Sequence, residues 1–175
     1  YKPVTYSQYN NKNIAWSTEE YNTGYWYNTA TSVIPDIATA PDGYVLADKL
    51  VGLSPVTARQ SVYQIVYMYA GITYTYSVYL KQAGYTTAML WIDTANISEG
   101  AYIGAGSLIN LTNGTRGGTQ TTVVDAGNGW YRCSITFTAA AVASQIRVLA
   151  PATGVFYVYG AQVEIGSFEI GRAHV

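Results

Sequence analysis

The chain has 175 residues, of which 49% are hydrophobic and 11% are charged, and its formal net charge is -1. The high apolar content and low charge exclude intrinsic disorder, and nine Lys and Arg residues supply no basic surface for duplex nucleic acid. The single Cys excludes an intramolecular disulfide and a multi-thiolate zinc site, and no apolar run approaches the ~20 residues of a membrane-spanning helix.

The predicted elements are β-strands, because side chains alternate with a period of two residues in several segments. In chain order these segments are residues 62–69, 74–81, 130–137, 146–148 and 155–163. Tight turns between strands are indicated by Pro41-Asp42-Gly43, Asn113-Gly114, Gly117-Gly118 and Asn128-Gly129. We expect about nine or ten strands without a helical period. The sequence therefore predicts an all-β fold, an antiparallel β-sandwich of the jelly-roll kind.

The last six residues, 170–175, have a sequence that read-through into a sequencing adapter would encode. They can be encoded by ATC GGA AGA GCA CAC GTC, which resembles the start of a common sequencing adapter. We therefore expect residues 1–169 to form a single domain and residues 170–175 to be a non-native tail from a metagenomic fragment. A natural short tail is the alternative. If the tail is non-native, His174, the only His, is not part of the evolved protein.

Tyrosine dominates the aromatic residues, with 18 Tyr against four Trp and three Phe. A ring with a hydroxyl group suits places that are half covered, where the hydroxyl meets water or a sugar. Tyr is also a good strand former on half-buried sheet faces. Two interpretations of this enrichment stay open: strand propensity alone, or a binding surface.

Four segments in chain order resemble motifs of one protein family. They are TAPDG with ADKL (39–43 and 47–50), GITYTYSVYLK (71–81), GNGWYRCS (127–134) and VYGAQVEIGSF (158–168). The family comprises phage structural-protein domains of the carbohydrate-binding-module-like type, found in tail fibres and head spikes. It is similar to the jelly-roll modules that bind xylan and β-glucan. The motifs themselves read as parts of the scaffold and do not identify ligand contacts.

The resemblance implies a non-catalytic module of a virion protein, extracellular, that binds a polysaccharide or cell-surface glycan through exposed aromatic residues. From the charge and the lack of a long apolar run we expect no nucleic-acid partner and no membrane insertion, and we expect no required cofactor. Two alternatives stay open. One is a structural virion module that packs against neighbouring subunits without binding a glycan, and the other is a polysaccharide-degrading domain.

Catalytic groups are scarce in the sequence, so we expect no enzyme activity. The only His lies in the suspect tail, which leaves no imidazole for a nucleophilic site. Cys133 alternates with apolar residues and is expected to be buried packing. No phosphate-binding or dinucleotide glycine motif occurs. A glycosidase needs two carboxylates across the scissile bond, and the best remaining pair is Asp93 and Glu99.

The candidate sugar site combines rings that stack on pyranose faces with polar groups that bind hydroxyls. The proposed aromatic residues are Trp26, which is the preferred platform, with Tyr25, Tyr27, Trp91, Tyr85 and Tyr102. The proposed polar partners are Gln64, Asn110, Asn113, Arg116 and Gln120. Core packing is the alternative for Trp91, which lies between two apolar residues. Trp130 is expected to be a structural lid over an end of the sandwich.

A structural Ca²⁺ is a further expectation, because jelly-roll modules often hold one with carboxylate and carbonyl oxygens. By resemblance Glu164, on the last predicted strand, is placed for this role, with Glu19 or Asn10 as partners. The alternative for Glu164 is a turn cap, or a pair with Arg132 or Arg147.

Overall fold

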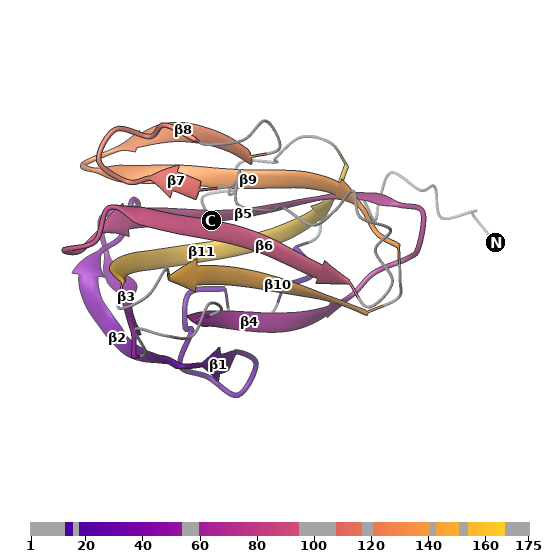
Figure 1. The fold of residues 1–175 in the computed structure, drawn as a ribbon, viewed down its shortest axis with the longest axis horizontal. Helices are drawn as coiled ribbons and strands as arrows, with labels where there is room; N and C mark the ends of the chain where they lie inside the picture. Colours follow the sequence, from indigo (N-terminus) through magenta and orange to yellow (C-terminus); the bar gives the residue numbers. More distant parts are fainter. Residues whose placement is uncertain are drawn as a thin grey trace.

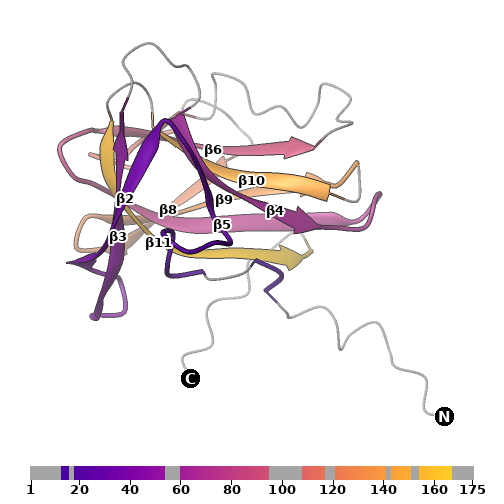
Figure 2. The same ribbon diagram turned by 90° about the horizontal axis from the view of Figure 1, so that it is seen from below.

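The computed structural model describes residues 13–15, 18–53, 60–94, 108–116, 121–140, 143–150 and 154–166. Within these residues the chain forms eleven β-strands in two layers (Figure 1 and Figure 2). The strands are β1 (Tyr27–Thr29), β2 (Thr31–Thr39), β3 (Val45–Gly52), β4 (Gln60–Tyr67), β5 (Thr73–Gln82), β6 (Thr87–Thr94), β7 (Leu108–Asn110), β8 (Thr121–Gly127), β9 (Trp130–Thr138), β10 (Ala143–Ala150) and β11 (Val155–Ile165). Among the described residues, no helix has the length and apolar character that crossing a membrane requires.

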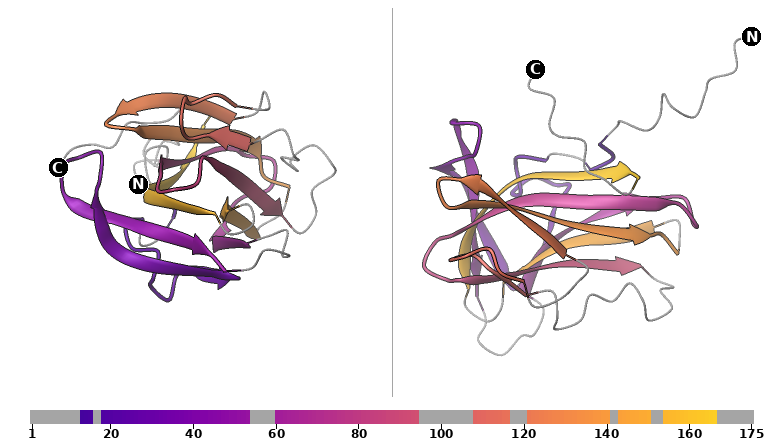
Figure 3. Two further views of the ribbon diagram at one scale, coloured as in Figure 1. Left: turned by 60° about the vertical axis from the view of Figure 1, so that its left-hand side comes forward. Right: turned by 90° about the horizontal axis from the view of Figure 1, so that it is seen from above.

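The two layers are antiparallel sheets. The five-stranded sheet has the order β1-β4-β10-β6-β7, and the six-stranded sheet has the order β2-β3-β11-β5-β9-β8. From β3 to β6 the chain changes sheet at every strand, and it changes again before β8, β10 and β11. Figure 3 shows the layers from two more directions, with the β2–β3 hairpin in purple at the margin of its sheet. The predicted all-β fold, an antiparallel β-sandwich of the jelly-roll kind, is confirmed.

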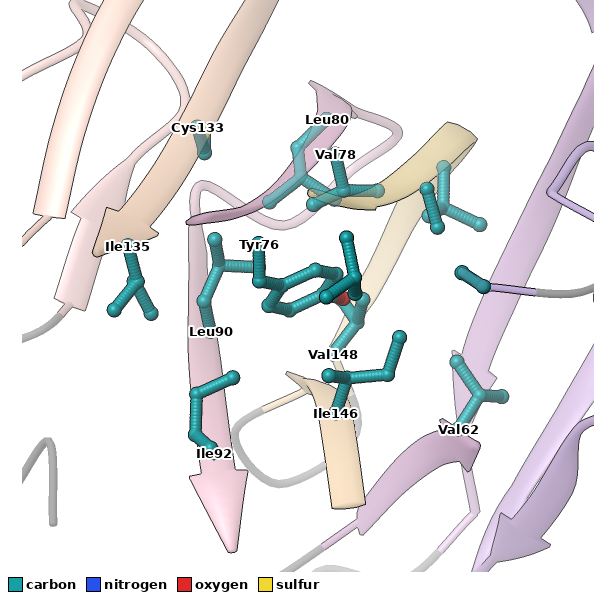
Figure 4. Close-up of a cluster of buried hydrophobic side chains, with 14 of the residues drawn as sticks. Val62, Tyr76, Val78, Leu80, Leu90, Ile92, Cys133, Ile135, Ile146 and Val148 are labelled. Carbon is teal, nitrogen blue, oxygen red and sulfur yellow. The ribbon is translucent and has the colours of Figure 1, made fainter. Parts of the chain in front are cut away.

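The core lies between the sheets, because alternate side chains of each strand point inward. Figure 4 shows Val78 and Leu80 of β5 on one side, Ile146 and Val148 of β10 on the other, and the ring of Tyr76 between them. All five side chains are fully buried. Complete burial of such a side chain stabilises the fold by about 1.5–3 kcal/mol. The five segments with a period of two residues therefore became strands because their apolar faces meet here.

Tyr76 brings a polar group into this core. Its hydroxyl is buried and has no hydrogen-bond partner among the described residues, and burial raises the pKa of Tyr76 above its usual range. Its neighbour on the same face, Tyr74, is also buried, but the Tyr74 hydroxyl accepts a hydrogen bond of 2.9 Å from the backbone N–H of Tyr69. The two tyrosines thus differ in whether burial of the hydroxyl is compensated.

The predicted tight turns are confirmed where the structure describes them. Asn128 and Gly129 have φ of 53° and 79°, so both occupy the left-handed region that a two-residue hairpin turn requires. In the turn at Pro41-Asp42-Gly43, the Asp42 carboxylate accepts a hydrogen bond of 3.2 Å from the backbone N–H of Tyr44. The turn at residues 117–118 lies outside the described residues.

The four sequence motifs meet on the outer face of the six-stranded sheet. A second buried cluster there contains Ala40, Ala47, Trp130 and Tyr159. The indole N–H of Trp130 donates a hydrogen bond of 3.0 Å to the carbonyl oxygen of Thr39. Each motif thus contributes to one packed unit, which holds the β2–β3 hairpin against the sheet. Trp130 is 1% exposed, so it is a packed structural residue, and its predicted role as a lid over an end of the sandwich stays a prediction.

A buried carboxylate that the sequence analysis did not identify fixes the start of the fold. Asp48 on β3 is fully buried and accepts hydrogen bonds from the backbone N–H groups of Tyr21, at 2.7 Å, and Asp36, at 3.0 Å. Asp36 has a φ of 51° in the irregular part of β2. Burial raises the pKa of Asp48, although the two backbone hydrogen bonds act in the opposite direction.

Candidate functional site

A row of large side chains crosses the outer face of the five-stranded sheet. Tyr27 on β1 is directly opposite Tyr63 on β4, Tyr63 is opposite Arg147 on β10, and Arg147 is opposite Trp91 on β6. Residues directly opposite each other on neighbouring strands point to the same face of a sheet. Four adjacent strands therefore place three aromatic rings and one guanidinium group in a single line.

The alternation on β4 explains why its tyrosines face outward. Val62 and Val66 are 0% and 2% exposed and belong to the core between the sheets. The intervening side chains point to the opposite face, and there Ile65 is 40% and Tyr67 is 75% exposed. The strand therefore presents Tyr63, Ile65 and Tyr67 along the outer face, at right angles to the row.

Tyr63 stands between two flat groups. The rings of Tyr27 and Tyr63 are stacked, with centroids 5.3 Å apart and an interplanar angle of 25°. On the other side the central guanidinium carbon of Arg147 lies 4.3 Å from the centroid of the Tyr63 ring. Arg147 is anchored by hydrogen bonds that it donates to Ser61 Oγ, at 3.1 Å, and to Gln145 Oε1. Since β4 lies between β1 and β10, both faces of the Tyr63 ring are covered.

Trp91 ends the row but is not open to solvent. Its neighbours Leu90 and Ile92 point into the core and are fully buried, so the Trp91 side chain points to the outer face. Trp91 is nevertheless only 8% exposed, and it belongs to neither buried hydrophobic cluster. The burial of Trp91 thus favours the packing interpretation over an exposed platform, although its side chain lies on the outer face of the sheet and not between the two sheets.

The prediction that Trp26 presents its ring to solvent is wrong. Trp26 is 4% exposed and lies in the core cluster, with its ring centroid 4.5 Å from that of Tyr21. It immediately precedes Tyr27, which is 50% exposed. Adjacent residues of an extended segment point in opposite directions, so the chain can expose only one of this pair, and the larger apolar ring is the one that is buried.

The prediction that Gln64 contacts a ligand from the surface is also wrong. Gln64 is 2% exposed and points to the core face of β4, like Val62 and Val66. The alternation of side chains along β4 already indicates in the sequence that Gln64 faces the core. The valines identify the core face, which assigns Gln64 to the interior and Tyr63 and Tyr67 to the surface.

The other predicted site residues are not brought together. Tyr25 is 55% exposed and precedes β1, at one edge of the five-stranded sheet. Asn110 lies on β7 at the opposite edge, where its side chain accepts a hydrogen bond of 2.9 Å from the backbone N–H of Thr112. Tyr85 is half-buried in the turn before β6, and the Arg116 guanidinium donates a hydrogen bond to the carbonyl oxygen of Thr121. The predicted residues that lie outside the described residues are Asn10, Tyr102 and Gln120, and likewise Glu99 and 170–175.

The structure describes two of the residues proposed for calcium. Glu164 is 5% exposed on β11, and Glu19 is half-buried in the turn that precedes β1. In the part of the chain that the structure describes, no three His, Cys, Asp or Glu side chains are grouped as metal ligands. Calcium binding therefore stays a prediction, and we derive no function from it.

Solved structures with the same fold include carbohydrate-binding modules. The chain matches the C-terminal family 22 carbohydrate binding module of Clostridium thermocellum Xyn10B with a TM-score of 0.57 and 19% identity, over 87% of this chain and 92% of that chain. It matches the CBM22-1-GH10 modules of Clostridium thermocellum xylanase 10B, complexed with xylohexaose, with a TM-score of 0.52 and 17% identity, over 82% and 26%. It matches the enzymatically active domain of bacteriophage CBA120 tailspike protein 4 with a TM-score of 0.54 and 12% identity, over 90% and 22%.

These similarities establish the fold. The chain spans about a quarter of the length of the xylanase and tailspike chains, and nearly all of the isolated module. No family model matches the sequence, and no curated protein matches it. The similarity to known proteins thus lies in the three-dimensional structure.

Proposed function

We propose that this chain is a non-catalytic carbohydrate-binding module of a phage virion protein that recognises a polysaccharide on the outer face of its five-stranded sheet. The observation that carries this proposal is the aromatic surface formed by the exposed Tyr27 and Tyr67 and the half-buried Tyr63, with Arg147 and Gln145 beside it. Pyranose rings have apolar C–H faces and a rim of hydroxyl groups. Tyrosine rings cover the former, and amide, guanidinium and phenol groups hydrogen-bond the latter.

The comparisons support the carbohydrate part of this proposal. A family 22 carbohydrate binding module shares the fold, and so does part of the CBM22-1-GH10 modules, whose structure is a complex with xylohexaose. The resemblance of the four motifs to tail-fibre and head-spike domains supports a place on a virion, and a tailspike domain shares the fold as well. An extracellular location follows from the same proposal, because a virion protein that binds a host glycan acts outside the cell.

We expect each site to bind weakly. A ring contact is worth about 0.5–1.5 kcal/mol beyond the area that it buries, so a few such contacts give dissociation constants of ~mM to µM. Many copies on one virion would raise the apparent affinity through effective concentration. Weak binding by one module is therefore compatible with firm attachment of a particle.

Affinity gel electrophoresis of the chain in gels that contain xylan, β-glucan, β-1,4-galactan or bacterial lipopolysaccharide tests the proposal. We expect retardation by at least one of these polysaccharides, and about fivefold weaker binding for Tyr27→Ala and Tyr67→Ala. Tyr44→Ala is the matched control, because Tyr44 is 68% exposed beside the other sheet. Absence of retardation in every gel, or an equal loss in the Tyr44 variant, would overturn the proposal.

A structural virion module is the second candidate, and one observation favours it. Exposed apolar side chains gather on the β2–β3 hairpin: Ile34, Ile37, Tyr44 and Val45 are 40–68% exposed. Such a group suits contact with a neighbouring subunit. Light scattering separates the candidates, because a module that packs through this hairpin forms an oligomer which Ile37→Lys abolishes. Release of reducing sugars from the same polysaccharides would instead indicate the degrading alternative.

A further inference from the structure

The rings on the candidate site differ in which part of the ring a ligand can reach. Side chains stand roughly perpendicular to a sheet, so the stacked rings of Tyr27 and Tyr63 rise edge-on from the surface. The Tyr63 ring has Tyr27 on one face and the Arg147 guanidinium on the other. Only the outer edge of the Tyr63 ring, with its hydroxyl group, remains for a ligand.

The hydroxyl group at this edge is available. Among the described residues, none donates to or accepts a hydrogen bond from the hydroxyl of Tyr27 or Tyr63, whose interactions are the stacking contacts alone. Arg147 is held in place by Ser61 and Gln145, which fixes the guanidinium plane against the ring. Groups on the neighbouring strands thus hold the faces of the Tyr63 ring covered, and the edge of the ring that carries the hydroxyl group faces outward.

Tyr67 offers the opposite arrangement. It lies four residues further along β4 on the same face, about 13 Å away. It is 75% exposed, and no aromatic or cationic group of the described residues stacks on its ring. A ligand can therefore lie flat against the Tyr67 ring. It cannot do so at Tyr63, where both ring faces are covered.

We infer that the two tyrosines divide the recognition of the glycan: Tyr63 contacts it through the ring edge and hydroxyl, and Tyr67 through the ring face. This inference rests on the proposed function. A hydrogen bond from the Tyr63 hydroxyl depends on the position of one sugar hydroxyl, whereas a ring face accepts any apolar pyranose face. Tyr63 therefore determines which glycan is selected, and Tyr67 contributes affinity with little selectivity.

Tyr→Phe and Tyr→Ala variants separate these roles. With each polysaccharide that retards the wild type in the affinity gels, Tyr63→Phe should weaken binding about fivefold, the loss expected for one neutral hydrogen bond. Tyr67→Phe should leave binding within about twofold and Tyr67→Ala should weaken it about fivefold. Tyr63→Phe keeps the ring that stacks with Tyr27 and Arg147, so its thermal unfolding should match that of the wild type.

The outcomes distinguish this inference from the function on which it rests. If the wild type binds and Tyr63→Phe binds equally well, the inference is wrong and the function stands. If Tyr67→Phe weakens glycan binding as much as Tyr67→Ala does, the division of roles between the two tyrosines is also wrong. If no polysaccharide retards the wild type, both fail. As a second readout, bound polysaccharide should shift the NMR signals of the Tyr63 ring positions next to the hydroxyl more than the inner ones, and shift both sets in Tyr67.

Discussion

The hydroxyl group of Tyr159 on β11 donates a hydrogen bond to the carboxylate of Asp42, which lies 117 residues earlier in the turn between β2 and β3. This contact joins two of the sequence motifs. We predict that Tyr159→Phe lowers the free energy of unfolding by about 1.5 kcal/mol, because the Asp42 carboxylate loses the hydroxyl that donates to it. Urea denaturation of the single variants and of the double variant with Asp42→Asn measures the coupling between the two side chains.

Tyr157→Phe is the matched control for this prediction. Tyr157 packs against the same cluster but is only partly buried, and we expect its hydroxyl to contribute less than about 0.5 kcal/mol. Equal losses in the two Tyr→Phe variants would show that the contact with Asp42 does not stabilise the hairpin.

Tyr76→Phe should leave the free energy of unfolding unchanged or raise it by about 1 kcal/mol, because it removes a buried hydroxyl for which the described part of the chain offers no hydrogen-bond partner. Tyr74→Phe should lower it by about 1 kcal/mol, since the Tyr69 N–H would lose its acceptor. Both residues lie on the core face of β5, which makes the pair a matched comparison. Thermal denaturation of both variants decides the matter, and a loss on Tyr76→Phe as large as that on Tyr74→Phe would contradict it.

Asp48 makes stability depend on pH. Its pKa is raised above the ordinary value of 3.8 by burial, so the folded state holds its proton more tightly than the unfolded state does. The stabilisation is present below pH 3.8 and is lost as the pH rises through the raised pKa. We therefore predict that the wild type, compared with Asp48→Asn, is relatively more stable at acid than at neutral pH. Urea denaturation from acid to neutral pH measures the free energy of unfolding of the wild type minus that of Asp48→Asn. An increase of this value with rising pH would mean that the fold lowers the pKa of Asp48.

Gly114→Ala should destabilise the protein more than Gly127→Ala. Both glycines have a positive φ, 70° and 82°, where an Ala costs about 1–2 kcal/mol. At Gly114 an added Cβ would also lie 2.6 Å from the Tyr131 ring, whereas at Gly127 nothing lies within 4 Å. The difference between the two midpoints of thermal unfolding isolates the contact with Tyr131. Equal midpoints would show that the ring moves aside at no cost.

Calcium binding, which the resemblance implies, is tested by thermal unfolding with and without a chelator. If a structural ion is bound, we expect EDTA to lower the midpoint of thermal unfolding and added Ca²⁺ to restore it. Glu164→Gln should abolish this response. An unchanged midpoint in EDTA would contradict the prediction.

The sequence predicted the fold well because the period of two residues is a local signal. The segments at 62–69 and 74–81 correspond to β4 and β5, and the buried Cys133 confirms which face of β9 points inward. β2 was harder to identify, because Pro35 and the positive φ of Asp36 interrupt its pairing with β3. Such irregularity arises from contacts with distant residues, here the carboxylate of Asp48, that no short segment reveals.

The candidate site was predicted only in part. Tyr27 was among the predicted residues, but Trp26 was the preferred platform, and its burial is decided by the core that it enters. Arg147 was considered only as a partner for Glu164. Its position beside Tyr63 depends on the pairing of β10 with β4, which are far apart in the sequence. Alternation within one strand shows which side chains face outward, whereas the register between strands decides which of them meet.

The packed unit of Trp130, Tyr159 and Asp42 and the row on β1, β4 and β10 lie on opposite outer surfaces of the sandwich. Substitutions in the row therefore leave the contacts that hold the hairpin untouched. A library that randomises positions 63, 65, 67 and 145 would vary the lining of one surface on an unchanged frame. Natural divergence among modules of this kind, and the redirection of one of them to a new sugar, can proceed by the same route.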